Sequence, residues 1–193
     1  MLQPLSSITL LIFFLLSFPP PAHSTAGKPP LDVVRSSCLH ASYPSLCVRT
    51  LSSFGGSANS PRDIAQAAVE VSIAHTQRVS SYLATLSGLR SKRERAALSD
   101  CVQQISDSVD ELSKTLTELK HLREETLRWQ MSNTQTWASA ALTNDDTCLD
   151  GFQDVESKVK ADVKRKISNV AKVTSNALYM INRLDESPGK PIG

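Results

Sequence analysis

Apolar residues recur every three or four positions over most of the chain after residue 60, a spacing typical of amphipathic α-helices. Four segments carry this pattern, at about residues 60–88, 91–121, 124–155 and 157–184. No segment alternates apolar and polar residues with the period of two that a half-buried strand requires. The positions that we expect on the buried faces are Ile64, Ala68, Val71, His75, Val79, Tyr82, Leu86 and Leu89; Leu98, Val102, Ile105, Val109, Leu112, Leu116 and Leu119; Leu127, Met131, Trp137, Ala141, Cys148 and Phe152; and Val159, Val163, Ile167, Val170, Thr174, Ala177, Ile181 and Leu184.

Boundary signals agree with four helices. Ser60 precedes Pro61, which suits the first position of a helix, and Asp63 favours the positive end of the helix dipole. Gly88 should end the first helix, and residues 143–146 (TNDD) should loosen or kink the third, because such side chains compete for backbone hydrogen bonds. Residues 187–189 (SPG) should end the last helix. The sequence therefore predicts an all-α fold, an up-down-up-down four-helix bundle at about residues 60–186.

A cysteine-bounded hairpin should precede the bundle. Cys38 and Cys47 enclose a segment in which Tyr43-Pro44 interrupts any helix. Pairing these two cysteines would close a hairpin at about residues 31–54 and stabilise it by roughly 2.7 kcal/mol in the loop-entropy model. Residues 54–57 (FGGS) should then form a flexible joint.

The amino end has the features of a secretory signal. Leu5 to Phe18 is an almost continuous apolar run, too short to span a bilayer comfortably, and Ala22-His23-Ser24 offers small residues to a signal peptidase. We expect a signal peptide at 1–24 and one domain at 25–193; a membrane anchor is the alternative. The 21 basic and 19 acidic residues give a formal charge of +2, which does not predict nucleic-acid binding.

Four cysteines in a secreted chain imply two disulfides, with three possible pairings. Cys101 falls on the second predicted helix and Cys148 on the third. These two can meet if the helices are antiparallel neighbours, and the bridge would contribute about 4 kcal/mol. We therefore favour Cys38–Cys47 with Cys101–Cys148.

The segment from Trp137 to Phe152 (WASAALTNDDTCLDGF) stands out. Its small residues would let a neighbouring helix approach closely, and its carboxylates and hydroxyls should form an exposed ridge beside Cys148. No nucleophile here has a base beside it, and His40, His75 and His121 are scattered over three elements. We predict no enzyme activity, no metal site and no cofactor, and we interpret Trp129 and Trp137 as packing anchors and His75 as a core or boundary residue.

The apolar leader, the Cys-x8-Cys hairpin, the third cysteine on a helix and the Ser139–Phe152 segment together resemble the plant invertase and pectin methylesterase inhibitor family, over about residues 32–185. The resemblance implies a helical hairpin before a four-helix bundle, secretion to the cell wall, and a free-standing inhibitor that is a monomer when free. Invertase inhibitors of the family carry a Pro-Lys-Phe motif, whereas the corresponding Val155–Val163 reads VESKVKADV. The favoured partner is therefore pectin methylesterase, its pectin cleft covered in a one-to-one complex, with acid invertase as the alternative.

The resemblance also implies which residues contact the target. These are Gln103, Asp107, Asp110, Gln135 and Thr147. Family members often have an acid where this chain has Gln103. The first three are three or four residues apart, so they share one helix face. The competing interpretations are a solvated face for the acids and a helix cap for Thr147.

Two other non-enzyme functions fit less well. Small helical lipid carriers usually contain eight cysteines, not four. A polyanion-binding wall protein could use the basic run Lys158, Lys160, Lys164, Arg165 and Lys166, but we interpret that run as a solvated face.

Overall fold

The computed structural model describes residues 31–54, 58–89, 91–155 and 158–186, and all regular structure in these ranges is helical. Its elements are α2 (Leu31–Cys38), α3 (Pro44–Ser52), α4 (Pro61–Thr85), α5 (Lys92–Lys120), the short 3-10 helix η1 (Glu124–Thr126), α6 (Leu127–Gly151) and α7 (Lys160–Glu186). The signal peptide expected at 1–24, the joint at 55–57 and the stop at 187–189 lie outside the described residues.

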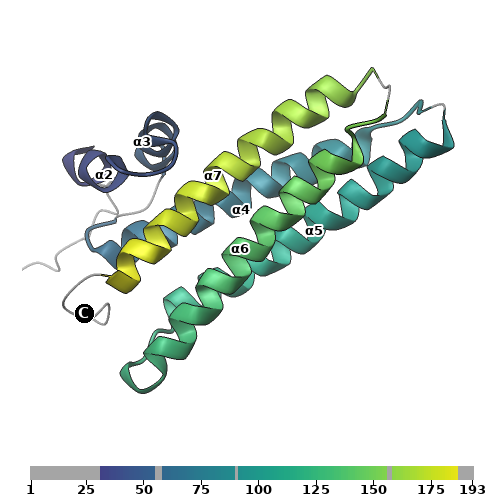
Figure 1. Cartoon of the computed structure of the whole chain (residues 1–193). Coiled ribbons are helices and arrows are strands. Elements are labelled where there is room, and N and C mark those ends of the chain that lie inside the picture. Colours follow the sequence, from purple (N-terminus) through teal and green to yellow (C-terminus); the bar gives the residue numbers. More distant parts are fainter. Residues whose placement is uncertain (1–30, 55–57, 90, 156–157, 187–193) are drawn as a thin grey trace, which may run out of the picture.

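The four long helices α4 to α7 form the predicted bundle (Figure 1). Each packs against two neighbours: α4 against α5 and α7, and α6 against α5 and α7. The pairs α5/α6 and α4/α7 therefore lie on opposite sides of the bundle (Figure 1). This order around the bundle decides which surface side chains can act together.

Serine capping boxes fix the starts of α4 and α5. The Ser60 hydroxyl accepts a hydrogen bond from the Asp63 N–H, and the Asp63 carboxylate accepts one from the Ser60 N–H, both at 3.1 Å. Ser91 and Glu94 make the same reciprocal pair before α5. These caps satisfy backbone donors that a helix start otherwise leaves unpaired. The predicted cap at Ser60 is confirmed.

Three predicted boundaries are corrected. Helix α4 ends at Thr85 rather than at Gly88, which lies in the following link with φ +77°. The third helix ends at Gly151 and the fourth begins at Lys160, so both are shorter than predicted. Helix α6 runs without a break through residues 143–146, where the sequence predicts a loosened or kinked segment, and the Thr143 and Thr147 hydroxyls donate to carbonyls one turn back in the same helix.

The buried faces match the predicted stripes in α7 and depart from them elsewhere. Every predicted α7 position except Val159 is buried. In α4, Ile64, Ala68 and Val79 are buried as predicted, whereas Val71, His75 and Tyr82 are only half-buried. The buried face also contains residues outside the predicted stripe: Ala65, Ala67, Val69, Ser72, Thr76 and Leu83. Its hydroxyls are satisfied: Ser72 and Thr174 share a 2.7 Å hydrogen bond between α4 and α7.

The amino-terminal hairpin is closed by a disulfide and held against the bundle by hydrogen bonds. A disulfide joins Cys38 to Cys47, as predicted, with their Cα atoms 5.7 Å apart. Buried Asn176 of α7 then accepts from the Tyr43 N–H at 2.9 Å and donates to the Tyr43 carbonyl at 3.1 Å. The first residues of α3 are thereby held against α7 (Figure 1).

Candidate functional site

Helices α5 and α6 form a tightly joined pair. The Cys101–Cys148 disulfide links them with a Cα–Cα distance of 4.4 Å, which confirms the second predicted bridge. Ala138 and Ala141 are completely buried, and the Ser108 hydroxyl donates to the Ala141 carbonyl of α6 at 3.2 Å. The small residues thus permit the close approach that the sequence predicts.

Hydrogen bonds between polar side chains also connect the two helices along the edge of their contact. The Asn144 amide donates to the Glu111 carboxylate at 3.0 Å, and the Gln130 amide donates to Glu118 at 2.8 Å. Partial burial, with Asp107 nearby, raises the pKa of Glu111 above its usual value. These bonds hold the surface of α5 and α6 in a fixed relation.

Four of the five residues predicted to contact a target lie on the α5 and α6 surface flanking the disulfide. Gln103 donates to the Asp107 carboxylate at 2.8 Å, and Asp110 is exposed one turn further along α5. Thr147 is exposed on α6, one residue before the bridging Cys148. Its hydroxyl donates to the Thr143 carbonyl at 2.7 Å within α6, so it is not a helix cap. The antiparallel register set by the disulfide places it at about the level of Gln103.

Gln135 is placed apart from the other four. Its amide donates to the Asp185 carboxylate at 3.2 Å, near the end of α7. Its side chain is therefore directed to the side of α6 that faces α7.

The ridge expected at residues 143–147 is interrupted at Asp145, which is fully buried. Neither of its carboxylate oxygens has a hydrogen-bonding partner. Burial, with a smaller contribution from Asp146, raises the pKa of Asp145 to about 8. The prediction that it is exposed is wrong, because Asp145 falls on the same face of α6 as Ala138, Ala141 and Cys148.

The interpretation of both tryptophans as packing anchors is also corrected. Trp129 is 76% exposed on the first turn of α6, and Trp137 is half-buried beside the core residue Ala138. Neither side chain lies on the buried face of the helix.

The α5/α6 surface carries charge of one sign, negative. The sequence motifs do not reveal this property. Residues 99–113 of α5 and 129–151 of α6 contain no lysine or arginine. We call this surface the acidic face. Its exposed carboxylates beyond the predicted ones are Asp100, Asp146 and Asp150. The sequence could have predicted this acidic face, because lysine and arginine are absent from two neighbouring helical stretches.

The exposed groups of the acidic face are carboxylates, amides and hydroxyls. In the described part of the chain, no group of three or more His, Cys, Asp or Glu side chains could hold a metal ion, and no cysteine is free. Within the same ranges no helix has the length and apolar character needed to cross a membrane. What the face offers a partner is a fixed array of carboxylates, amides and hydroxyls.

Comparisons with known proteins place the chain in a family. It is 59% identical over 169 residues to Pectinesterase inhibitor 3 of Arabidopsis thaliana, covering 83% of this chain and 82% of that protein. It is 35% identical to a 21 kDa protein of Daucus carota, covering 82% of this chain and 86% of the other. A crystal structure of a mutant form of a pectin methylesterase inhibitor from Arabidopsis superposes with a TM-score of 0.61 at 23% identity, covering 75% of this chain and 92% of that one, and so shows the same fold. The family model described as plant invertase/pectin methylesterase inhibitor matches residues 32–180. The chain therefore belongs to the plant invertase/pectin methylesterase inhibitor family.

Proposed function

We propose that this protein inhibits plant pectin methylesterase by binding it through the acidic face. The observation that carries the proposal is the 59% identity to Pectinesterase inhibitor 3 over 82% of that protein. In the proposed complex one bundle covers the pectin-binding cleft of one enzyme molecule, so substrate cannot enter. The inhibitor needs no reactive group, because exclusion of the substrate is sufficient.

The architecture of the acidic face supports this role. A surface held by the Cys101–Cys148 bridge and by the Asn144–Glu111 bond changes little on binding, so little conformational entropy is lost when it docks. Exposed Gln103, Asp110 and Thr147 offer acceptors and donors to the partner. A surface with carboxylates and no basic residues is complementary to a basic partner surface and would speed their association.

The direct test is an inhibition assay with the purified, oxidised chain. We expect it to stop acid release from methyl-esterified pectin by a plant pectin methylesterase and to leave sucrose hydrolysis by an acid invertase unchanged. Inhibition of the invertase alone would replace the proposed target with the alternative one. Full activity of both enzymes would refute the proposal.

A second test asks whether the acidic face makes the contact. Asp107→Lys combined with Thr147→Trp reverses a charge and adds bulk there, so it should abolish inhibition. The matched control is Glu125→Lys with Thr117→Trp, because both residues are exposed and the Thr117 hydroxyl bonds one turn back, as that of Thr147 does. Thr117 is 16 residues beyond Cys101 on α5, about 24 Å along the helix. The control should inhibit like the wild type, and equal inhibition by both variants would exclude this face.

We further propose that the chain is secreted after removal of residues 1–24 and is a monomer when free. The apolar run from Leu5 to Phe18 supports the first point. Determining the amino-terminal residue of the protein collected from plant cell walls tests it: a chain that begins near Thr25 supports cleavage, and one that retains Leu5 to Phe18 contradicts it.

A further inference from the structure

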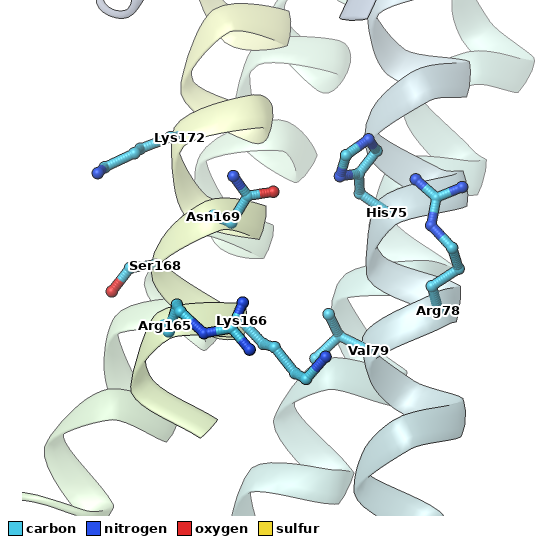
Figure 2. A pocket seen from close by; sticks show the side chains of 8 residues that line it. All are labelled: His75, Arg78, Val79, Arg165, Lys166, Ser168, Asn169 and Lys172. Atoms are coloured by element: carbon cyan, nitrogen blue, oxygen red, sulfur yellow. The ribbon is translucent and has the colours of Figure 1, made fainter. Parts of the chain in front are cut away.

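A positively charged groove runs between α4 and α7 (Figure 2). These two helices lie on the side of the bundle opposite α5 and α6, which carry the acidic face (Figure 1). The groove has a volume of about 580 Å³. Figure 2 shows side chains from both helices around it, with Val79 the one apolar residue among those that line it. The lining residues are His75, Arg78 and Val79 of α4 and Arg165, Lys166, Ser168, Asn169 and Lys172 of α7.

Most of the positive charge in this groove makes no close ion pair among the described residues. Arg165 pairs with Asp162 on the same helix, and the charge of Lys166 also acts on the Asp162 carboxylate. In the described ranges, no ion pair within 4.0 Å is found for Arg78, Lys166 or Lys172. Cations that line one groove without close counter-ions favour the binding of an anion there. The basic run that the sequence presents as a solvated face thus contributes Arg165 and Lys166 to a site completed by Arg78 of another helix.

The half-buried His75 responds to the same charge. Burial lowers its pKa below the usual value, and the charge of Arg78 and then that of Arg49 on α3 lower it further, while a hydrogen bond to Asn169 acts in the opposite direction. Arg49 thereby belongs to the positive region, although it does not line the α4/α7 groove itself.

The groove continues into a second hollow against the hairpin. That hollow, of about 430 Å³, is lined in part by Tyr43 and Arg49 and shares Asn169 and Lys172 with the first. Two of the cations lie over tyrosine rings: the Lys166 ammonium is 4.3 Å from the centre of the Tyr82 ring, and the Lys172 ammonium is 5.6 Å from that of Tyr43. The site is therefore elongated, with cations along its length.

We propose that this groove binds a carboxylate-bearing acidic oligosaccharide, a stretch of de-esterified pectin. Two features favour such a chain over a single small anion: the two joined hollows, and the separation of the cations on different helices. Ser168 and Asn169 supply hydrogen-bonding groups for sugar hydroxyls. The identity of the sugar rests on the proposed function, because pectin methylesterase produces these carboxylates.

The test is calorimetric titration of the purified chain, without any enzyme, with an oligomer of de-esterified galacturonate. We expect binding that weakens as salt is added, and no binding of the fully methyl-esterified oligomer, because it lacks the charges. The variant Arg78→Gln with Lys166→Gln and Lys172→Gln should lose about tenfold in affinity, because it removes three exposed charge pairs that are each weak on their own. Inorganic phosphate, titrated separately, should bind much more weakly than the oligomer.

A matched variant separates the groove from general charge. Lys92→Gln with Lys114→Gln and Arg128→Gln removes the same number of lysines and arginines from exposed positions on α5 and α6. It should bind the oligomer within about twofold of the wild type, and thermal melting monitored by circular dichroism checks that both variants are folded. Equal losses in both variants, unchanged binding by the groove variant, equal binding of the methyl-esterified oligomer or equally tight binding of phosphate would each overturn the proposal. Inhibition is assayed separately, so a chain that binds the oligomer and does not inhibit would refute the proposed function alone.

Discussion

Asp145 is a carboxylic acid that the fold keeps in its neutral form. The side chain is completely buried, its oxygens have no hydrogen-bonding partner, and its pKa of about 8 results mainly from burial. At the pH of an acidic compartment the group therefore holds its proton in the native state. In the unfolded chain the same group would lose its proton above about pH 4.

This difference predicts that the free energy of unfolding falls as the pH rises. Below about pH 4 both states bind the proton and the contribution of Asp145 is complete; between about pH 4 and 8 only the native state binds it. The loss from this group should be about 1.4 kcal/mol per pH unit in that window. Asp145→Asn should remove this dependence and make the protein more stable than the wild type at pH 7. Urea unfolding at a series of pH values measures both effects.

The adjacent Asp146 provides the control for that experiment. It is exposed, so Asp146→Asn should leave the pH dependence of the wild type nearly unchanged. If Asp145→Asn shows the same slope as the wild type between pH 4 and 8, the carboxyl group is ionised in the native state and the interpretation is wrong.

Gln135 allows a second prediction for a single residue. Its amide bonds to Asp185 of α7, away from the other residues predicted to contact a target. Gln135→Ala should therefore change the inhibition constant by less than about twofold. Asp107→Ala should weaken inhibition by more, because it removes a charge from the face that is proposed to dock on the enzyme. The two inhibition constants, measured with the same esterase, compare the sides of α6; a larger loss for Gln135→Ala would move the contact surface towards α7.

At the level of the helices, one disulfide fixes the position of α5 relative to α6. Cys101→Ala with Cys148→Ala removes a bridge across 47 residues and should lower the free energy of unfolding by about 4 kcal/mol. It should also weaken inhibition at temperatures at which the protein is still folded, because the two helices that form the acidic face lose their fixed relation. Urea unfolding and the inhibition constant are the two measurements.

The hairpin disulfide is the natural comparison. Cys38→Ala with Cys47→Ala removes a bridge between residues only nine positions apart, which contributes roughly 2.7 kcal/mol, and the substitutions lie away from α5 and α6. The folded variant should inhibit like the wild type. Loss of inhibition in this variant and its retention without the Cys101–Cys148 bridge would show that the hairpin, not the α5/α6 pair, presents the binding surface.

The sequence predicts where the helices lie, but it predicts their buried faces only in part. In α7 the predicted stripe matches the core because its positions are apolar or small, from Val163 to Leu184. In α6 a stripe drawn through the large apolar residues selects Trp137, whereas the buried face passes through Thr134, Ala138 and Asp145. Thr134 is tolerated there because its hydroxyl donates to the Met131 carbonyl at 2.7 Å. Polar residues that bond within their own helix are therefore hard to assign from periodicity.

For the molecule as a whole, a formal charge of +2 conceals a separation of charge. The carboxylates of the acidic face lie on α5 and α6, and the cations of the groove lie on α4 and α7. The sequence gives the number and order of these residues, but placing them on opposite sides requires the order of helices around the bundle. For this reason the sequence alone suggests a solvated face for the charged run at residues 158–166. The structure adds that Arg78 lines the same groove as part of this run.

The opposite placement of the two surfaces predicts a ternary complex. An inhibitor docked on the esterase through α5 and α6 keeps its α4/α7 groove open, so the preformed complex should bind the de-esterified oligomer within about twofold of the free inhibitor's affinity. The enzyme's own cleft is covered in that complex, so a complex made with the Arg78, Lys166 and Lys172 glutamine variant should bind about tenfold more weakly. Calorimetric titration of the two complexes makes the comparison. If the oligomer binds both complexes equally, its binding site is on the enzyme. If it binds neither complex, or displaces the inhibitor, the two surfaces of the inhibitor overlap. Each of these results would contradict the placement of the two binding sites on opposite sides of the bundle.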